Sequence, residues 1–280
     1  MMIAPRTIYA VIPAASAAGP ALAGFQALPT GENAKLVGVY VAPIAMNYGL
    51  VADMALASFI EAQVEAAKTE RQAAQAAFLA ACEQAGVRSE WRAAQSIDVV
   101  VSPQAGLMAR AADIVLCPYL LEQDSLGRHR LEEVVFASGR PVIGLPAEWT
   151  GSQLGKRVLI AWDGGREAAR AAFDAMPLLR QAEKVRLVSV NGFQQDPVRQ
   201  FTPGDEIAAT LSRHNIPVEA HSFESTRRSV ADELHAQMLE FGADLLVMGC
   251  YGHSRFRERI LGGVSREMLQ EIQFPLLLAN

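Results

Sequence analysis

The residues best suited to chemistry in this chain lie near its C-terminus, where glycines recur at fixed intervals after an apolar run. The run 244–248 ends in Gly249, Gly252 follows three residues later, and Gly262 and Gly263 come after nine more residues, just before a helical pattern. A buried strand, a glycine turn and a helix N-terminus together form the usual cradle for a phosphate group. Glycine suits such a cradle because the backbone must approach the anion closely. The spacing G-x2-G-x9-G therefore predicts an anion-binding loop.

Polar side chains in and around this loop can contact the rest of a nucleotide. Asp163 follows another apolar run, and a carboxylate at the end of a strand accepts hydrogen bonds from a ribose hydroxyl or a base amine. Ser254 and Ser265 offer hydroxyl donors. His253 and Arg255 can add positive charge toward a polyphosphate. These residue types favour a phosphorylated ligand.

Purely structural alternatives exist for these residues. Asp163 can simply cap the helix that follows it, and the pair 262–263 can be a plain loop before a helix. We expect His253 to be structural or to face a phosphate loosely, not to act as a general base. The arginines at 255, 257 and 259 alternate with Glu258, so most of this run is expected to be a solvated face.

The elements that must position these residues alternate between short apolar runs and helical patterns. Runs rich in Val, Ile and Leu with little alternation indicate strands buried on both faces, and hence a doubly wound parallel sheet between helices. In the second half the predicted strands are 158–162, 185–190, 218–223, 244–248 and 275–279, and the predicted helices are 166–179, 204–214, 230–241 and 264–272. Ligands of such sheets bind beyond the carboxyl ends of the strands, where strand order reverses. Asp163 and Gly249 are expected there.

The first half of the chain repeats this plan, which indicates a tandem duplication. Residues 7–12 mirror 157–162, residues 112–116 mirror 243–247, and residues 140–145 mirror 274–279. A long Ala-, Glu- and Gln-rich helix is predicted over 52–84, before a glycine. We place one domain at 1–148 and the other at 155–280, with the linker within 147–156.

The first domain keeps the strands but lacks the chemistry of the second. Pro13 falls where the second domain has Asp163, and Pro118 falls near the position of Gly249 with no G-x2-G after Tyr119. Proline has no N–H donor and a fixed φ, so it cannot replace glycine in an anion cradle. We therefore predict one competent site per chain, in the second domain.

The whole chain resembles a tandem universal stress protein, although the specific motif covers only the second domain. The matching pieces are residues 161–164, Gly249-x2-Gly252-His253, and Gly262 before the last helix. The resemblance implies two five-stranded parallel sheets between helices, with the two units pairing through their last strands. It also implies ATP or another adenine nucleotide at the strand ends, with or without Mg²⁺.

Carried over residue by residue, the resemblance assigns Asp163 to the adenosine and Val190 to the adenine pocket. The residues that it places around the ribose and phosphates are Gly249, Gly252, His253, Gly262, Gly263, Val264 and Ser265. One position departs from the pattern, because the family has Ser or Thr where this chain has Gly263. A neutral hydrogen bond contributes about 0.5–1.5 kcal/mol and one to a charged group about 1.5–3 kcal/mol. Loss of this hydroxyl donor would therefore lower the affinity roughly 10-fold unless Ser265 compensates.

Bulk properties narrow the function classes. The net charge of −5 comes without a compensating basic stripe, which argues against a nucleic-acid partner. No window reaches the roughly 18–20 apolar residues of a membrane span, and the apolar run at 8–12 is interpreted as a first strand in preference to a secretory signal. The three cysteines, Cys82, Cys117 and Cys250, have no metal-ligand spacing, so free thiols in a reducing cytoplasm are expected.

The sequence therefore predicts a cytoplasmic, nucleotide-binding regulatory protein of the stress response, in which ligand occupancy changes partner or dimer contacts. An enzyme is the first alternative, at most a slow ATPase, because no G-x4-G-K-[S/T] loop or Ser-His-Asp constellation is evident. A scaffold of the same fold that binds no ligand is the second. No catalytic residue and no resident metal site are predicted.

Overall fold

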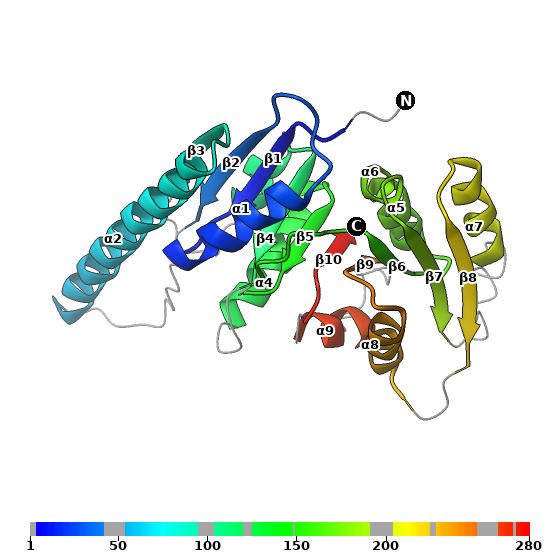
Figure 1. Ribbon diagram of the computed structural model, residues 1–280. Coiled ribbons are helices and arrows are strands. Elements are labelled where there is room, and N and C mark those ends of the chain that lie inside the picture. Colours follow the sequence, from blue (N-terminus) through cyan, green and yellow to red (C-terminus); the bar gives the residue numbers. More distant parts are fainter. Residues whose placement is uncertain are drawn as a thin grey trace.

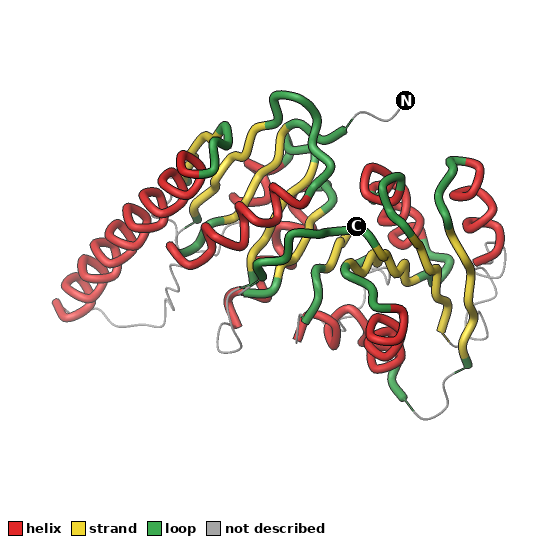
Figure 2. The backbone as a smooth tube through the Cα atoms, in the orientation of Figure 1, coloured by secondary structure: helices red, strands yellow, loops and turns green. Residues whose placement is uncertain are grey.

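The two halves of the chain share one ten-stranded sheet with helices on both faces (Figures 1 and 2). The computed structural model describes residues 4–41, 54–94, 104–119, 125–147, 149–190, 204–224, 228–250, 263–270 and 273–280. The strand order is β3-β2-β1-β4-β5-β10-β9-β6-β7-β8. All neighbouring strands are parallel except β5 and β10, which are antiparallel. The predicted α/β class and parallel sheets are confirmed.

The two units have the same succession of strands. The elements of the first are β1 Thr7–Val11, η1 Ala15–Ala17, α1 Ala18–Ala27, β2 Lys35–Tyr40, α2 Met54–Gln84, β3 Ser89–Ala93, α3 Gln104–Ala109, β4 Ile114–Pro118, α4 Ser125–Ser138 and β5 Val142–Leu145. Those of the second are β6 Arg157–Ala161, α5 Arg166–Asp174, α6 Met176–Leu179, β7 Lys184–Val190, α7 Gly204–Arg213, β8 Val218–Phe223, α8 Val230–Phe241, β9 Leu245–Gly249, α9 Gly263–Gln270 and β10 Leu276–Ala279.

The units join through their last strands at the middle of the sheet, where the C-terminus also lies (Figure 1). Leu277 of β10 is opposite Ile143 of β5. An apolar layer on each face of the sheet runs through both units. Helices α1, α2, α5, α6 and α7 contribute to one layer, and α3, α4, α8 and α9 to the other. The fold is therefore held by two continuous cores instead of one core per unit.

Local sequence explains where several helices begin and end. Ser229 precedes α8, its Oγ accepts from the Asp232 N–H, and the Asp232 carboxylate accepts from the Ser229 N–H. Gly242 ends α8 in the left-handed conformation, with φ of +61°. The predicted helix 166–179 is instead two helices, α5 and α6. Pro177 lies in the first turn of α6 and has no N–H for the carbonyl four residues earlier, so the longer helix breaks there.

An aspartate repeated in the two units ties the start of a central strand to its neighbour. Asp113, before β4, accepts from the N–H groups of Arg6 and Thr7 at 2.8 and 2.9 Å. Asp244, before β9, accepts from the N–H groups that precede and open β6: Gly155 at 2.8 Å, Lys156 at 3.0 Å and Arg157 at 3.4 Å. The two units thus share this hydrogen-bonding arrangement, which was not evident in the sequence.

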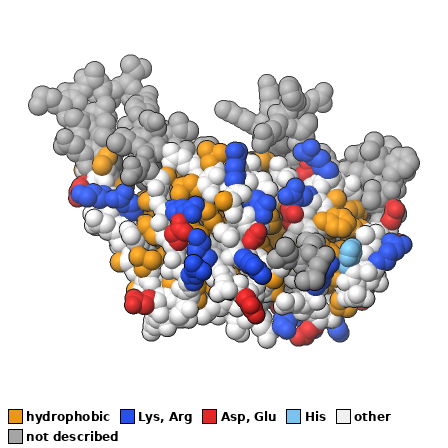
Figure 3. All heavy atoms as spheres, turned by 90° about the horizontal axis from the view of Figure 1, so that it is seen from above, with side chains coloured by type: hydrophobic (Ala, Val, Ile, Leu, Met, Phe, Trp, Pro, Cys, Tyr) orange, Lys and Arg blue, Asp and Glu red, His pale blue; other side chains and the backbone are white. Residues whose placement is uncertain are grey.

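The surface mixes side chains of all kinds on the face seen in Figure 3, where basic, acidic and apolar groups are interspersed. No helix in the described ranges has the length and apolar character that crossing a bilayer requires. The three cysteines are buried and form no disulfide with one another.

At the outer edge of the first unit, Glu90 of β3 gives a pH-dependent prediction. Hydrogen bonds from Arg92 (2.6 Å) and Lys35 (2.5 Å) lower the pKa of Glu90 from 4.5 to about 2. A depressed folded-state pKa means that this stabilisation is complete above pH 4.5 and is lost as the pH falls toward 2. Because the group is partly exposed, we expect Glu90→Gln to cost no more than about 1 kcal/mol at pH 7.

Urea unfolding of wild type and Glu90→Gln at pH 7, 4 and 2.5 checks this expectation. The difference between the two midpoints should shrink over that range. An equal difference at pH 7 and pH 2.5 would show that ionised Glu90 contributes nothing.

Candidate functional site

The carboxyl ends of β6 and β9 meet at the point where the strand order of the second unit reverses. From β6 the chain passes to β7 on one side, whereas β9 lies on the other side. The register pairs Ala161 of β6 with Met248 of β9 and with Val188 of β7. Asp163 and Gly249 therefore follow these pairs on adjacent strands, and Val190 ends the third. Crevices of this kind are the usual ligand sites of doubly wound sheets.

Asp163 is exposed and orders the turn that leads into α5. Its Oδ1 accepts a hydrogen bond from the Gly165 N–H at 2.8 Å, and Gly164 between them has φ of +72°. Gly165 is the N-cap residue of α5, so Asp163 is not itself the cap. The structural alternative for Asp163 thus has a concrete form, a side-chain turn before the helix.

Gly249 ends β9 against the first turn of α5. A Cβ at this position would lie 2.4 Å from the backbone nitrogen of Ala168 and 2.5 Å from the carbonyl carbon of Glu167. Both contacts are far shorter than any real carbon contact, and both are with backbone. Glycine is therefore required here by the close approach of strand and helix, independently of any ligand.

The structure describes four of the other predicted site residues. Val190 and Val264 are half-buried and pack against the apolar layer that contains Met248. Gly263 is the first residue of α9, and Ser265 on that helix is buried. Five predicted site residues lie outside the described residues: Gly252, His253, Ser254, Arg255 and Gly262.

Two residues that sequence reasoning missed lie beside this edge. Glu167, in the first turn of α5, is buried next to Gly249 and forms an ion pair with the exposed Arg166, whose pKa is raised by that contact. Ser189 precedes Val190 on β7, is 4% exposed, and its Oγ has no hydrogen-bond partner within the described ranges. An acidic residue soon after Asp163 was visible in the sequence, but the burial of either side chain was not.

At the equivalent edge of the first unit, prolines replace two of the site residues and a tyrosine contacts the second unit. Pro13 follows β1 and Pro118 ends β4, and both are buried. Tyr119 and Cys250 are equivalent, because each donates its N–H to the last strand of its unit, to Leu145 at 2.7 Å and to Ala279 at 2.9 Å. The Tyr119 hydroxyl donates to the Leu269 carbonyl of α9 at 3.3 Å. This end of the first unit therefore contacts the second unit.

The second unit matches a known protein family. The model of the universal stress protein family matches residues 155–280. The second unit belongs to the universal stress protein family. No curated protein sequence matches the chain.

Solved structures show that the tandem universal stress protein fold extends over the whole chain. A universal stress protein from Archaeoglobus fulgidus DSM 4304 superposes with a TM-score of 0.65 at 16% identity, covering 97% of this chain and 96% of that one. A functionally unknown protein from Pseudomonas aeruginosa PAO1 gives 0.56 at 13% identity, with 98% and 92% covered. At these identities the likeness is one of fold.

Proposed function

We propose that this protein binds ATP or another adenine nucleotide at one site, in its second unit, and acts as a regulatory protein of the stress response. The observation that carries the proposal is the switch point of the family-matched unit. Asp163 follows β6 and Gly249 ends the adjacent parallel strand β9, whereas Pro13 and Pro118 stand at the equivalent places in the first unit. Occupancy of the site would change contacts with a partner or a second copy.

The apolar and polar groups at this edge support a nucleoside. Val190 offers an apolar wall at the end of β7, beside the strand that leads to Asp163. The carboxylate of Asp163 is exposed at the strand end and can accept from a ribose hydroxyl or base amine while it keeps its bond to Gly165. Helix α9 begins at Gly263, at the end of the glycine-spaced segment, so its N-terminal amides are the expected phosphate contacts.

The direct experiment identifies what the purified protein carries. We would denature fresh protein, identify released nucleotide by mass spectrometry, and titrate ATP and AMP by calorimetry with and without Mg²⁺. We expect about one adenine nucleotide per chain, because the second unit alone keeps the site residues. Rapid metal-dependent turnover would favour the ATPase alternative. An empty protein that gives no heat would favour the ligand-free scaffold.

Substitutions test the placement of the site. Gly252→Val is expected to weaken binding at least about 100-fold, because a branched side chain would intrude on the phosphate loop. Asp163→Ala is expected to weaken it about 10-fold through loss of a charged acceptor. Pro118→Ala in the first unit serves as the control and should leave the affinity unchanged. Wild-type affinity in Gly252→Val would show that the site lies elsewhere.

A further inference from the structure

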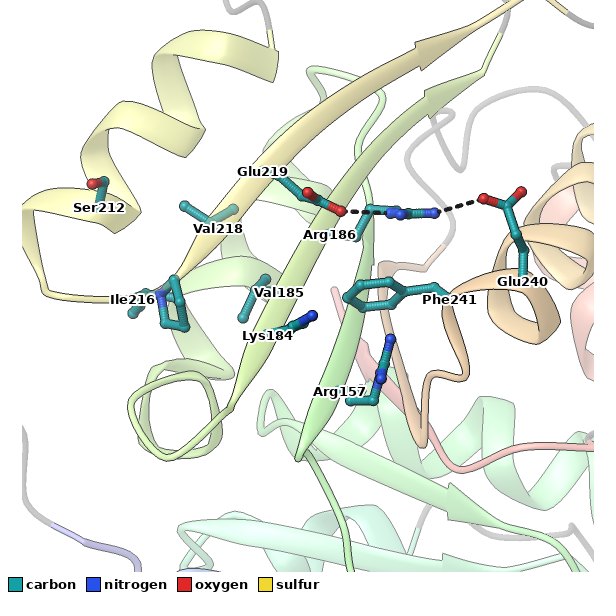
Figure 4. A pocket seen from close by; sticks show the side chains of 11 residues that line it. Arg157, Lys184, Val185, Arg186, Ser212, Ile216, Val218, Glu219, Glu240 and Phe241 are labelled. Atoms are coloured by element: carbon teal, nitrogen blue, oxygen red, sulfur yellow. Dashed lines mark hydrogen bonds and ion pairs between the residues drawn. The ribbon is translucent and has the colours of Figure 1, made fainter.

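A second candidate site lies at the opposite edge of the same sheet. A hollow of about 540 Å³ opens at the amino-terminal ends of β6, β7 and β8 and is closed on one side by the end of α8 (Figure 4). Strand β7 has seven residues, so Lys184 at the hollow and Val190 at the nucleotide edge are about 20 Å apart. The volume is within the range of small-molecule sites, about 300–1,000 Å³.

Both carboxylates that line the hollow form ion pairs with the same arginine, Arg186. Arg186 on β7 donates from Nε to Glu219 at 2.9 Å and from Nη1 to Glu240 at 3.3 Å. The hydrogen bond from Arg186 lowers the pKa of Glu219, which is therefore ionised at neutral pH. These three side chains carry a net charge of −1 among themselves, and neither carboxylate forms an ion pair with Arg157 or Lys184.

Two further cations face the hollow without a counter-ion. The Arg157 guanidinium lies 4.9 Å from the centre of the Phe241 ring, and Arg186 lies 4.5 Å from the same ring. Figure 4 shows the ends of Arg157 and Lys184 pointing toward Phe241. The Nε of Arg157 is buried without a hydrogen-bond partner, and across the described ranges neither Arg157 nor Lys184 has a carboxylate within 4.0 Å. A buried charged donor without a partner is costly, which favours an anion beside it.

The first unit provides an internal comparison, because the registers of the two units correspond. Arg157 pairs with Lys184 across β6 and β7, as Thr7 pairs with Lys35 across β1 and β2. In the first unit the lysine is neutralised by Glu90 at 2.5 Å. In the second unit the equivalent glutamate is held by Arg186, and an arginine replaces the threonine. The unpaired cations are therefore specific to the second unit.

We propose that this hollow binds a small organic anion, with a phosphate or carboxylate group held by Arg157 and Lys184 and an apolar part beside the half-buried Val218. Arginine's planar donors match the oxygens of either group, and the lysine adds a mobile charge. Val218 lies at the start of β8 and lines the hollow on the side away from Arg157 (Figure 4). Binding of the anion at the hollow requires neither the nucleotide nor the proposed nucleotide site.

Calorimetric titration of the full chain with phenyl phosphate and with benzoate tests the proposal, with neutral benzamide as the uncharged probe. We expect both anions to bind and benzamide not to bind. Arg157→Gln and Lys184→Gln should each weaken binding about 10-fold, the loss expected for one charge-assisted hydrogen bond. Lys184 is exposed, so its variant should fold even if Arg157→Gln disturbs the stack on Phe241.

The matched control is Lys156→Gln, which removes the same charge from a neighbouring lysine that pairs with Glu183 and does not line the hollow. It should change affinity less than about twofold, since exposed charges at a distance are screened. Excess adenosine, which carries no phosphate and therefore lacks the anion that the hollow requires, should not displace phenyl phosphate, which separates this site from the nucleotide site. Equal binding of benzamide, an equal loss in Lys156→Gln or displacement by adenosine would each overturn the proposal. So would the absence of heat at phenyl phosphate concentrations up to about 10 mM.

Discussion

Replacing Gly249 with alanine is expected to destabilise the protein by about 3 kcal/mol, the upper range for forcing one extra group into a packed interior. The added Cβ would lie within 2.5 Å of two backbone atoms in the first turn of α5, at Glu167 and Ala168. Backbone cannot turn away as the end of a flexible side chain can. Either α5 or the end of β9 must therefore move, and the loop after Asp163 would move with α5.

Gly19→Ala in α1 is the comparison, because nothing beyond its chain neighbours lies within 4 Å of a Cβ at that exposed position. It should change stability by no more than about 1 kcal/mol, because alanine favours helix over glycine but the ring of Pro20 disfavours the helical conformation of a preceding residue that has a Cβ. Urea unfolding of both variants and of wild type measures the difference. The same samples should be titrated with ATP. A Gly249→Ala variant that is as stable as wild type but no longer binds nucleotide would mean that this glycine serves the ligand and not the packing.

Much of the fold could be predicted from the sequence because its strands are short, continuous apolar runs. Runs such as those of β6 and β9 have few alternatives, since Val, Ile and Leu without alternation fit a strand covered on both faces. Helix α8 could be delimited to the residue because Ser229 and Gly242 are strong start and stop signals. The duplication followed from the repeated order of these elements.

Most of the features that escaped prediction depend on contacts between distant residues. Gly249 was interpreted only as a place for a phosphate to approach, whereas its neighbour in the fold is the backbone of α5. Whether Glu167 is buried depends on that same contact. The break between α5 and α6 is a local effect of Pro177 that the apolar pattern of the segment concealed.

The hollow at the amino-terminal edge could not be predicted for the same reason. Arg157, Lys184 and Phe241 come from three separate elements, and only the sheet register and the position of α8 bring them together. In the sequence each is an ordinary residue at the boundary of a strand or helix. What distinguishes the two cations is that the described residues leave them without a carboxylate, and pairing is a property of the folded chain.

The duplicated aspartates allow a second large effect to be predicted with its own control. Asp244→Ala is expected to destabilise the protein by about 3 kcal/mol, because the carboxylate accepts from three backbone N–H groups that precede and open β6. Hydrogen bonds to a charged group contribute about 1.5–3 kcal/mol each, and these contributions are not additive. Asp113→Ala should cost about half as much, because Asp113 accepts from two N–H groups at an exposed position where water can replace it.

Urea unfolding of the two alanine variants, with Asp244→Asn beside them, measures this difference. Asparagine keeps one acceptor oxygen, so we expect Asp244→Asn to fall between wild type and Asp244→Ala. Equal losses in Asp244→Ala and Asp113→Ala would contradict the assignment, since the number of amides served and their exposure would then have no effect. Because one of the three amides belongs to Arg157, Asp244→Ala should also weaken phenyl phosphate binding at the hollow, whereas Asp113→Ala should not.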